Sequence, residues 1–149
     1  MKKIAFTLLV IVWMGVIFAF SSQNGDNSSK SSSRITKIVV KYIEKIKDTK
    51  LSDEKKDTVD YIVRKIAHFT EYFILAILVF LMLKEYKISY IYLWTILVCF
   101  LYASTDEFHQ LFVGERAGQP LDVLIDTSGS IVAVLIISIL LIPKKKKHK

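Results

Sequence analysis

The sequence predicts an all-α, polytopic membrane protein with four transmembrane helices and an amphipathic helix in the first extracytoplasmic loop. Three observations lead to this class. First, hydrophobic residues make up 52% of the 149-residue chain. Second, these residues form long blocks that contain almost no charged residue. Third, basic residues gather where the blocks end. A chain of this length suits one compact unit, so residues 1–149 are predicted to form a single membrane domain.

Four apolar blocks are long enough to cross a bilayer, which takes about 20 residues with a range of roughly 17–25. The spans are predicted at residues 4–20, 66–83, 88–105 and 123–143. The first and third contain no charged residue. The alternative is a soluble bundle of four buried helices. It is disfavoured because such helices carry a polar face.

The first block has a second interpretation, because Lys2 and Lys3 precede an apolar run, as in a secretory signal peptide. Ala19-Phe20-Ser21 would serve as the cleavage site. The apolar run is longer than the usual core of a signal peptide. A retained membrane anchor is therefore favoured.

The loop between the first two spans, residues 21–65, divides into two parts. Residues 21–33 are rich in Ser, Asn and Gly, which predicts a flexible linker. Residues 35–46 predict a basic amphipathic helix that lies on the membrane surface or caps the helix bundle. Its apolar members are Ile35, Val39, Tyr42, Ile43 and Ile46, and its lysines are Lys37, Lys41 and Lys45. Ser52, followed by two acids, marks the start of a helix that continues into the second span.

Basic residues determine the predicted orientation. Two lysines precede the first span, Lys84 and Lys87 lie between the second and third, and a run of lysines within 144–149 follows the fourth. Four spans place these groups on one side, which the positive-inside rule makes cytoplasmic. The loop at 21–65 is also net basic, but long loops translocate with weak regard to charge. We therefore expect a multi-pass cell-membrane protein with both termini in the cytoplasm.

The net charge of +7 does not indicate nucleic-acid binding, because much of the excess lies beside the ends of the spans. Anionic lipid headgroups are the expected partners of these lysines. The single cysteine, Cys99, lies within the third span and is expected to be a buried, unreactive packing residue.

Ionisable residues gather at the opposite ends of the spans. Arg64, His68 and Glu71 follow one another at i, i+4 and i+7 and share one helix face. Asp122 and Asp126 are likewise one turn apart. Ionisable groups in a membrane are costly and often mark a functional site, although local ion pairs or solvated helix ends are the alternative. The full set is Arg64, Lys65, His68, Glu71, Glu107, Gln110, Arg116, Asp122 and Asp126.

Residue chemistry suggests roles within this set. Glu71 or Glu107 could act as a base, with His68 as the proton carrier, and these three are the candidate catalytic residues. The remaining residues are candidates for substrate binding, because Arg64 and Arg116 can hold a phosphate or carboxylate through forked hydrogen bonds. A divalent metal on the histidine and the acids is conceivable. However, no established ligand spacing is present, so neither a metal nor another cofactor is predicted.

Three motifs occur in order along the chain. They are Arg64-Lys65-x-Ala67-His68-Phe69-x-Glu71-Tyr72, Asp106-Glu107-x-His109-Gln110-x-Phe112-x-x-x-Arg116 and Asp122-x-x-x-Asp126-Thr127-x-Gly129. Together with Phe20-Ser21-Ser22-Gln23 after the first span, they resemble the signature of VanZ-like membrane proteins over nearly the whole chain. The resemblance implies a bacterial cell-membrane protein. The member that gives this family its name is associated with resistance to the glycopeptide antibiotic teicoplanin.

Three functions follow as hypotheses. The first is an enzyme or binding site for a lipid-linked envelope precursor or a glycopeptide at the outer membrane face. The second is a non-catalytic scaffold or binding protein, in which the polar residues form an interhelical packing network. The third is a small transporter, which would have to oligomerise because four short spans enclose little space.

Overall fold

The computed structural model of the protein describes residues 1–22, 25–112 and 120–141. Within these ranges the chain forms five α-helices and no strand, which confirms the all-α prediction. The helices are α1 (Lys2–Ser21), α2 (Gly25–Lys47), α3 (Asp53–Glu85), α4 (Ile91–Gln110) and α5 (Pro120–Leu140). Helices α1, α3, α4 and α5 are long and apolar enough to cross a membrane, which confirms the four predicted spans.

The helices extend beyond the apolar blocks that predict the spans. Helix α3 begins at Asp53 and continues through the second apolar block as one helix of 33 residues. Helix α4 continues past residue 105 to Gln110. Helix α5 begins with Pro120, at a position where a proline removes no helical hydrogen bond. The polar residues beside each block therefore belong to the same rigid helices as the apolar residues.

The prediction of a flexible linker at residues 21–33 is wrong for most of this segment, because α2 already begins at Gly25. Serine and asparagine cost at most about 0.7 kcal/mol per residue in a helix relative to alanine. A segment rich in these residues can therefore extend a helix whose second half is stabilised by packing. The amphipathic helix predicted at 35–46 is this second half of α2.

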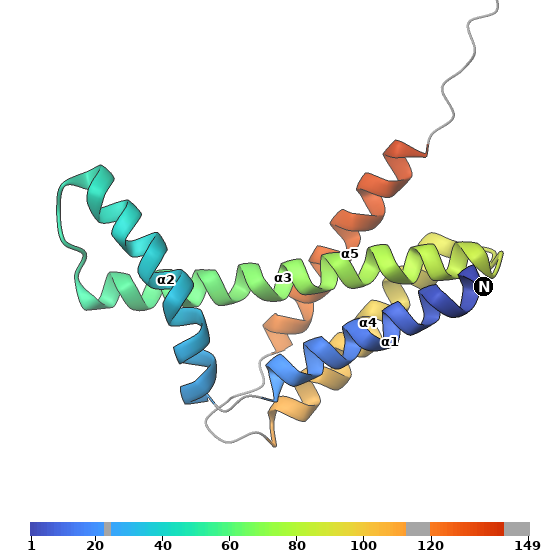
Figure 1. Ribbon diagram of the computed structural model, residues 1–149, viewed down its shortest axis with the longest axis horizontal. Coiled ribbons are helices and arrows are strands. Elements are labelled where there is room, and N and C mark those ends of the chain that lie inside the picture. Colours follow the sequence, from blue (N-terminus) through green and yellow to red (C-terminus); the bar gives the residue numbers. More distant parts are fainter. Residues whose placement is uncertain (23–24, 113–119, 142–149) are drawn as a thin grey trace, which may run out of the picture.

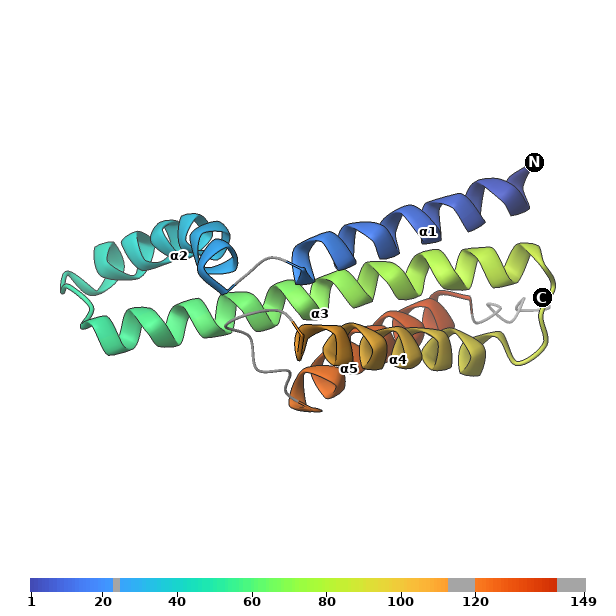
Figure 2. The same ribbon diagram turned by 90° about the horizontal axis from the view of Figure 1, so that it is seen from below.

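Helix α3 is the axis of the described structure and packs against all four other helices. In Figure 2, α1, α4 and α5 lie along the C-terminal part of α3, and α2 lies beside its N-terminal part. Figure 1 shows α2 crossing α3 beyond the end of α1. The described chain is therefore a four-helix bundle with a helical hairpin, formed by α2 and the start of α3, that projects from one end.

The bundle core consists mainly of small and medium-sized side chains. Its buried members are Val10, Ile17, Tyr72, Leu75, Ala76, Val79, Cys99, Ala103 and Ala133. The complete burial of Cys99 agrees with its predicted packing role. Large apolar side chains such as Leu93 and Leu135 are instead exposed on the outer faces of the spans. Soluble monomers rarely expose extended apolar surface, whereas the hydrocarbon of a bilayer would cover it. The exposed apolar faces thus support a multi-pass membrane protein.

Helices α3 and α5 form the most extensive contact between elements, and Gly129 permits their close approach. A Cβ atom at this position would overlap the backbone carbonyl oxygen of Phe69. One residue later, Ser130 Oγ donates a hydrogen bond to the carbonyl oxygen of Tyr72 at 3.3 Å. Small residues allow such approach between membrane helices. Because Asp126 precedes Gly129 by about one turn, the same contact places Asp126 against α3.

Candidate functional site

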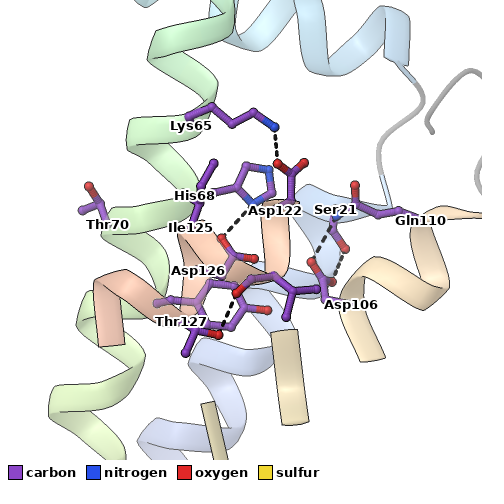
Figure 3. A network of polar contacts seen from close by, with 12 residues as sticks. Ser21, Lys65, His68, Thr70, Asp106, Gln110, Asp122, Ile125, Asp126 and Thr127 are labelled. Carbon is purple, nitrogen blue, oxygen red and sulfur yellow. Dashed lines mark hydrogen bonds and ion pairs between the residues drawn. The ribbon is translucent and has the colours of Figure 1, made fainter. Parts of the chain in front are cut away.

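The polar residues of the spans meet at one end of the bundle, where α1 and α4 end and α5 begins (Figure 3). All four membrane-crossing helices contribute to this group, which we call the polar cluster. Its members are Ser21 of α1, Lys65, His68, Glu71 and Tyr72 of α3, Asp106, Glu107 and Gln110 of α4, and Asp122 and Asp126 of α5.

Two polar pairs join α3 to α5. Lys65 Nζ forms an ion pair with Asp122 Oδ1, and His68 Nδ1 lies 3.6 Å from Asp126 Oδ1. The two partners on each helix are three or four residues apart, so they lie on one face of that helix. Both pairs are visible in Figure 3, one turn apart along the helices. The arrangement places two nitrogen-bearing side chains of α3 opposite two carboxylates of α5.

A second set of contacts joins α1 to α4 through Asp106. Ser21 Oγ donates a hydrogen bond to Asp106 Oδ1 at 2.5 Å, and Gln110 Nε2 donates one to Asp106 Oδ2 at 3.2 Å. All three side chains are buried. Each carboxylate oxygen of Asp106 therefore has a donor, which compensates for its removal from water. This half of the polar cluster has the properties of an interhelical packing contact.

The surroundings of Asp126 are different. This residue is only 1% exposed, and within the described residues neither of its carboxylate oxygens accepts a hydrogen bond. The fully buried Tyr72 hydroxyl also has no hydrogen-bond partner in the described part of the chain. Tyr72 interacts electrostatically with Asp106 and Asp126. The interior of the polar cluster therefore contains hydrogen-bonding capacity that the described contacts leave unused.

Acids outnumber bases in the polar cluster. It holds five carboxylates but only one lysine and one histidine, and Asp126 interacts electrostatically with all four other acids. Lys65 is already paired with Asp122. Carboxylates held this closely repel one another, and the repulsion grows as the surroundings become less polar. Such a group favours cations, protons or hydrogen-bond donors over anions.

Most of the residues singled out from the sequence come together here, and Arg64 is the exception. Its guanidinium lies 3.4 Å from Asp60 Oδ2 and its side chain is 40% exposed. Arg64 does share a face of α3 with His68 and Glu71, but its turn lies beyond the end of the bundle. There the face meets α2 instead of α5. Arg116 lies outside the described residues, so its predicted place in the group is untested.

Three members of the polar cluster, Ser21, Tyr72 and Asp106, are not among the site residues predicted from the sequence. The i, i+4 spacing of Asp106 and Gln110 is a signal that could have included the aspartate. No local spacing connects Ser21 with Asp106, because 85 positions separate them.

The acids do not assemble into an evident metal site. Across residues 1–22, 25–112 and 120–141, no group of three or more His, Cys, Asp or Glu side chains has the proximity needed to hold a metal ion. The set considered from the sequence, His68, Glu71, Glu107 and Asp122, is therefore not gathered around one point in that part of the chain.

Comparison with known proteins identifies one relationship. The family model described as VanZ/LLP1 matches residues 6–141, a range that includes every member of the polar cluster. No curated protein and no solved structure matches the chain significantly.

Proposed function

Because the chain belongs to the VanZ/LLP1 family, and because four of its helices can cross a membrane, we propose that it acts at the bacterial cell envelope. In this proposal the polar cluster lies at the outer face of the cell membrane. It binds the polar head of a lipid-linked envelope precursor, and His68 and Asp126 exchange a proton with that head. Altered handling of such a precursor would change susceptibility to glycopeptides of the teicoplanin type.

The contrast between Asp106 and Asp126 carries the proposal. Both are buried carboxylates of the same cluster, but both oxygens of Asp106 accept hydrogen bonds and those of Asp126 accept none from the described residues. A buried polar group without a partner costs about 1–3 kcal/mol, and more if it is charged. A network that served packing alone would be expected to satisfy Asp126 as it satisfies Asp106.

The excess of acids indicates the chemistry of the ligand. Lys65 is engaged by Asp122 and Arg64 by Asp60, so these two side chains are already paired with acids and are poorly placed to hold a phosphate. The carboxylates can accept hydrogen bonds from hydroxyl, amide or ammonium groups. The head of a lipid-linked precursor built from sugars and amino acids offers all three. His68 Nδ1 lies 3.6 Å from Asp126 Oδ1, beyond direct hydrogen-bond distance, so in this proposal a polar group of the ligand enters between them and takes part in the proton exchange.

A packing network is the second candidate, and particular contacts favour it. The Lys65–Asp122 ion pair joins α3 to α5, and Ser21 joins α1 to α4 through Asp106. If the cluster only stabilises the bundle, each substitution within it should lower stability, and no added ligand should restore it.

A cellular test uses Asp126→Asn, which keeps the shape of the side chain and removes its charge. The protein is expressed in a teicoplanin-susceptible Gram-positive strain that lacks its own copy, and the inhibitory concentration is measured together with the amount of protein in the membrane. We expect the wild type to raise the inhibitory concentration several-fold and Asp126→Asn to abolish the increase. Glu54→Gln, at an exposed position near the start of α3, is the matched control and should behave as the wild type.

A binding test uses purified protein in lipid nanodiscs and measures the melting temperature with and without a lipid-linked peptidoglycan precursor. A ligand at 100 times its Kd adds about 2.7 kcal/mol of stability. The wild type and Glu54→Gln should therefore melt higher with the precursor, whereas Asp126→Asn should not respond. If the wild type does not respond, or if Asp126→Asn is unstable in every condition, the packing network is the better explanation.

A further inference from the structure

Helix α2 is attached to α3 by one of its faces. Thr36 and Val40 are buried at this contact. Thr36 Oγ1 donates a hydrogen bond to Asp60 Oδ1 at 2.7 Å. Near the end of α2, Glu44 Oε1 accepts one from the Leu51 backbone N–H at 2.9 Å. These contacts fix the rotation of α2 about its own axis and so determine which side chains remain outside.

A second face of α2 is apolar and uncovered by any described part of the chain. It consists of Ile35, Ile38, Tyr42 and Ile46, which are 57–76% exposed. Their spacing of three or four residues places them on one side of the helix, and we call them the apolar stripe. Of the five apolar residues predicted to share a face, Val39 and Ile43 are only half-exposed. The apolar pattern of α2 is thus divided between α3 and the surroundings.

A third face of α2 is basic. Lys37, Lys41 and Lys45 are all exposed and lie one turn apart. The first two line a cavity of about 660 Å³ between α2 and α3, to which α3 adds Lys56 and Arg64. Three acids, Glu44, Asp57 and Asp60, also line the cavity. Two of these acids are engaged, Glu44 by the Leu51 N–H and Asp60 by Thr36 and Arg64.

The contact between Thr36 of α2 and Asp60 of α3 lies close to the outer edge of the headgroup layer of a membrane. Asp60, which holds Thr36, precedes the start of the apolar block at Ile66 by six residues. At about 1.5 Å per residue, α2 meets α3 roughly 9 Å outside the hydrocarbon. The headgroup layer on each side of a bilayer is about 5–8 Å thick. Figure 1 shows α2 crossing α3 near this end of the bundle instead of continuing along its axis.

From these observations we propose that α2 is an interfacial helix that binds anionic phospholipids. The apolar stripe enters the headgroup layer from its outer edge. Lys37, Lys41 and Lys45 bind the lipid phosphates, because each lysine near an anionic membrane surface is attracted to it. An exposed apolar stripe beside a row of lysines is the pattern of helices that lie in a membrane interface. This proposal is independent of the function assigned to the polar cluster.

Spin labels can test the depth of the stripe. Single cysteines replace Ile38, Tyr42 and Thr49 in a Cys99→Ala background, and the protein is placed in nanodiscs containing phosphatidylglycerol. Labels at Ile38 and Tyr42 should collide with oxygen, which concentrates in lipid, several-fold more than with a water-soluble nickel complex. The label at Thr49, which is exposed in the turn after α2, should show the opposite preference. Equal nickel access at all three positions would overturn the proposal.

The choice of lipid is tested by comparing nanodiscs of phosphatidylcholine with nanodiscs rich in phosphatidylglycerol. The oxygen preference at Ile38 should rise with the anionic lipid. In the triple variant Lys37→Gln, Lys41→Gln, Lys45→Gln, the oxygen preference at Ile38 should no longer rise with the anionic lipid. A matched triple variant with glutamine at Lys47, Lys50 and Lys55, which are also exposed, removes the same charge and should retain the response.

Two further measurements test whether free phosphate or a second copy of the chain, instead of anionic lipid, binds at α2. Inorganic phosphate added to phosphatidylcholine nanodiscs should not reproduce the change at Ile38. If it does, the lysines form a phosphate site and the lipid proposal is wrong. Strong spin–spin broadening between labels at Ile38, or a disulfide formed through Ile38→Cys, would instead assign the stripe to a second copy of the chain.

Discussion

Asp106 and Asp126 lie in the same polar cluster but differ in their hydrogen bonding. Asp106 is held between Ser21 and Gln110, and these contacts require α1 and α4 to meet at their C-terminal ends. Asp126 lies opposite His68 and accepts no hydrogen bond from the described residues. At the scale of single residues, therefore, Asp106 is suited to hold helices together, whereas Asp126 is suited to interact with a ligand or a proton.

Replacing Ser21 with alanine tests the packing role of Asp106. The substitution removes the donor to Asp106 Oδ1 and leaves a buried oxygen with less compensation. A loss of about 1–3 kcal/mol is expected for such a change, measured as a lower melting temperature or denaturation midpoint in detergent. Ser22→Ala is the matched control, because Ser22 Oγ bonds only to the Phe18 carbonyl of its own helix among the described contacts. Similar stability of the two variants would contradict the packing role.

Gly129 provides a second prediction at this scale. Alanine at this position would place a methyl group against the Phe69 backbone, which cannot move without separating α3 from α5. Overpacking of this kind costs about 1–3 kcal/mol. Gly15→Ala in α1 is the control, because a Cβ atom there would meet nothing within 4 Å. It should leave the melting temperature unchanged or raise it slightly, since alanine favours helix over glycine. Equal effects of both changes would show that helix propensity dominates.

At the scale of elements, α3 packs against both α2 and α5 with one continuous face. Around Asp60 and Arg64 this face meets α2, and around His68 it meets α5. The amino-acid pattern predicts the helix and the shared face, because both depend only on local spacing. It does not predict that the bundle ends between these turns, since that depends on where α1, α4 and α5 end. The spacing therefore predicts that Arg64 joins His68 and Glu71, whereas in the structure it pairs with Asp60.

The contact between α3 and α5 leads to a prediction about Lys65 and Asp122. Both side chains are largely buried, so removing either one leaves an uncompensated charge in a poorly polar environment. Lys65→Met and Asp122→Leu should each lower the free energy of unfolding, and the double variant should lose less than the sum. A coupling of about 0.5–3 kcal/mol is expected for groups in direct contact.

The exposed pair Lys56 and Asp53 is the reference for this cycle. Exposed ion pairs contribute little, because water and salt screen them. The same double-mutant cycle at Lys56 and Asp53 should show no measurable coupling. Additive effects at Lys65 and Asp122 would mean that this ion pair does not stabilise the contact between α3 and α5.

At the scale of the whole molecule, the polar cluster arises because all four membrane-crossing helices carry polar residues at the same membrane level. The sequence predicts this convergence, because four spans alternate in direction and so return their polar ends to one side. It does not predict the contact between Ser21 and Asp106 or the exposure of the apolar stripe on α2. Both depend on helix rotations that tertiary packing determines. A pattern of apolar residues also cannot distinguish a face that meets protein from one that meets lipid.

The orientation of the molecule is the last prediction. If both termini are cytoplasmic, the lysines around the turn after α3 obey the positive-inside rule, and the polar cluster faces outward. Phe112, which is 74% exposed, lies at the cluster end of α4, and exposed Ser89 lies in the turn at the opposite end. Each is replaced by cysteine in a Cys99→Ala background, and intact cells are treated with a membrane-impermeant maleimide. Phe112→Cys should react in intact cells and Ser89→Cys only after permeabilisation. The reverse pattern would place the polar cluster and α2 on the cytoplasmic side, where an envelope precursor exposed at the cell surface could not reach them.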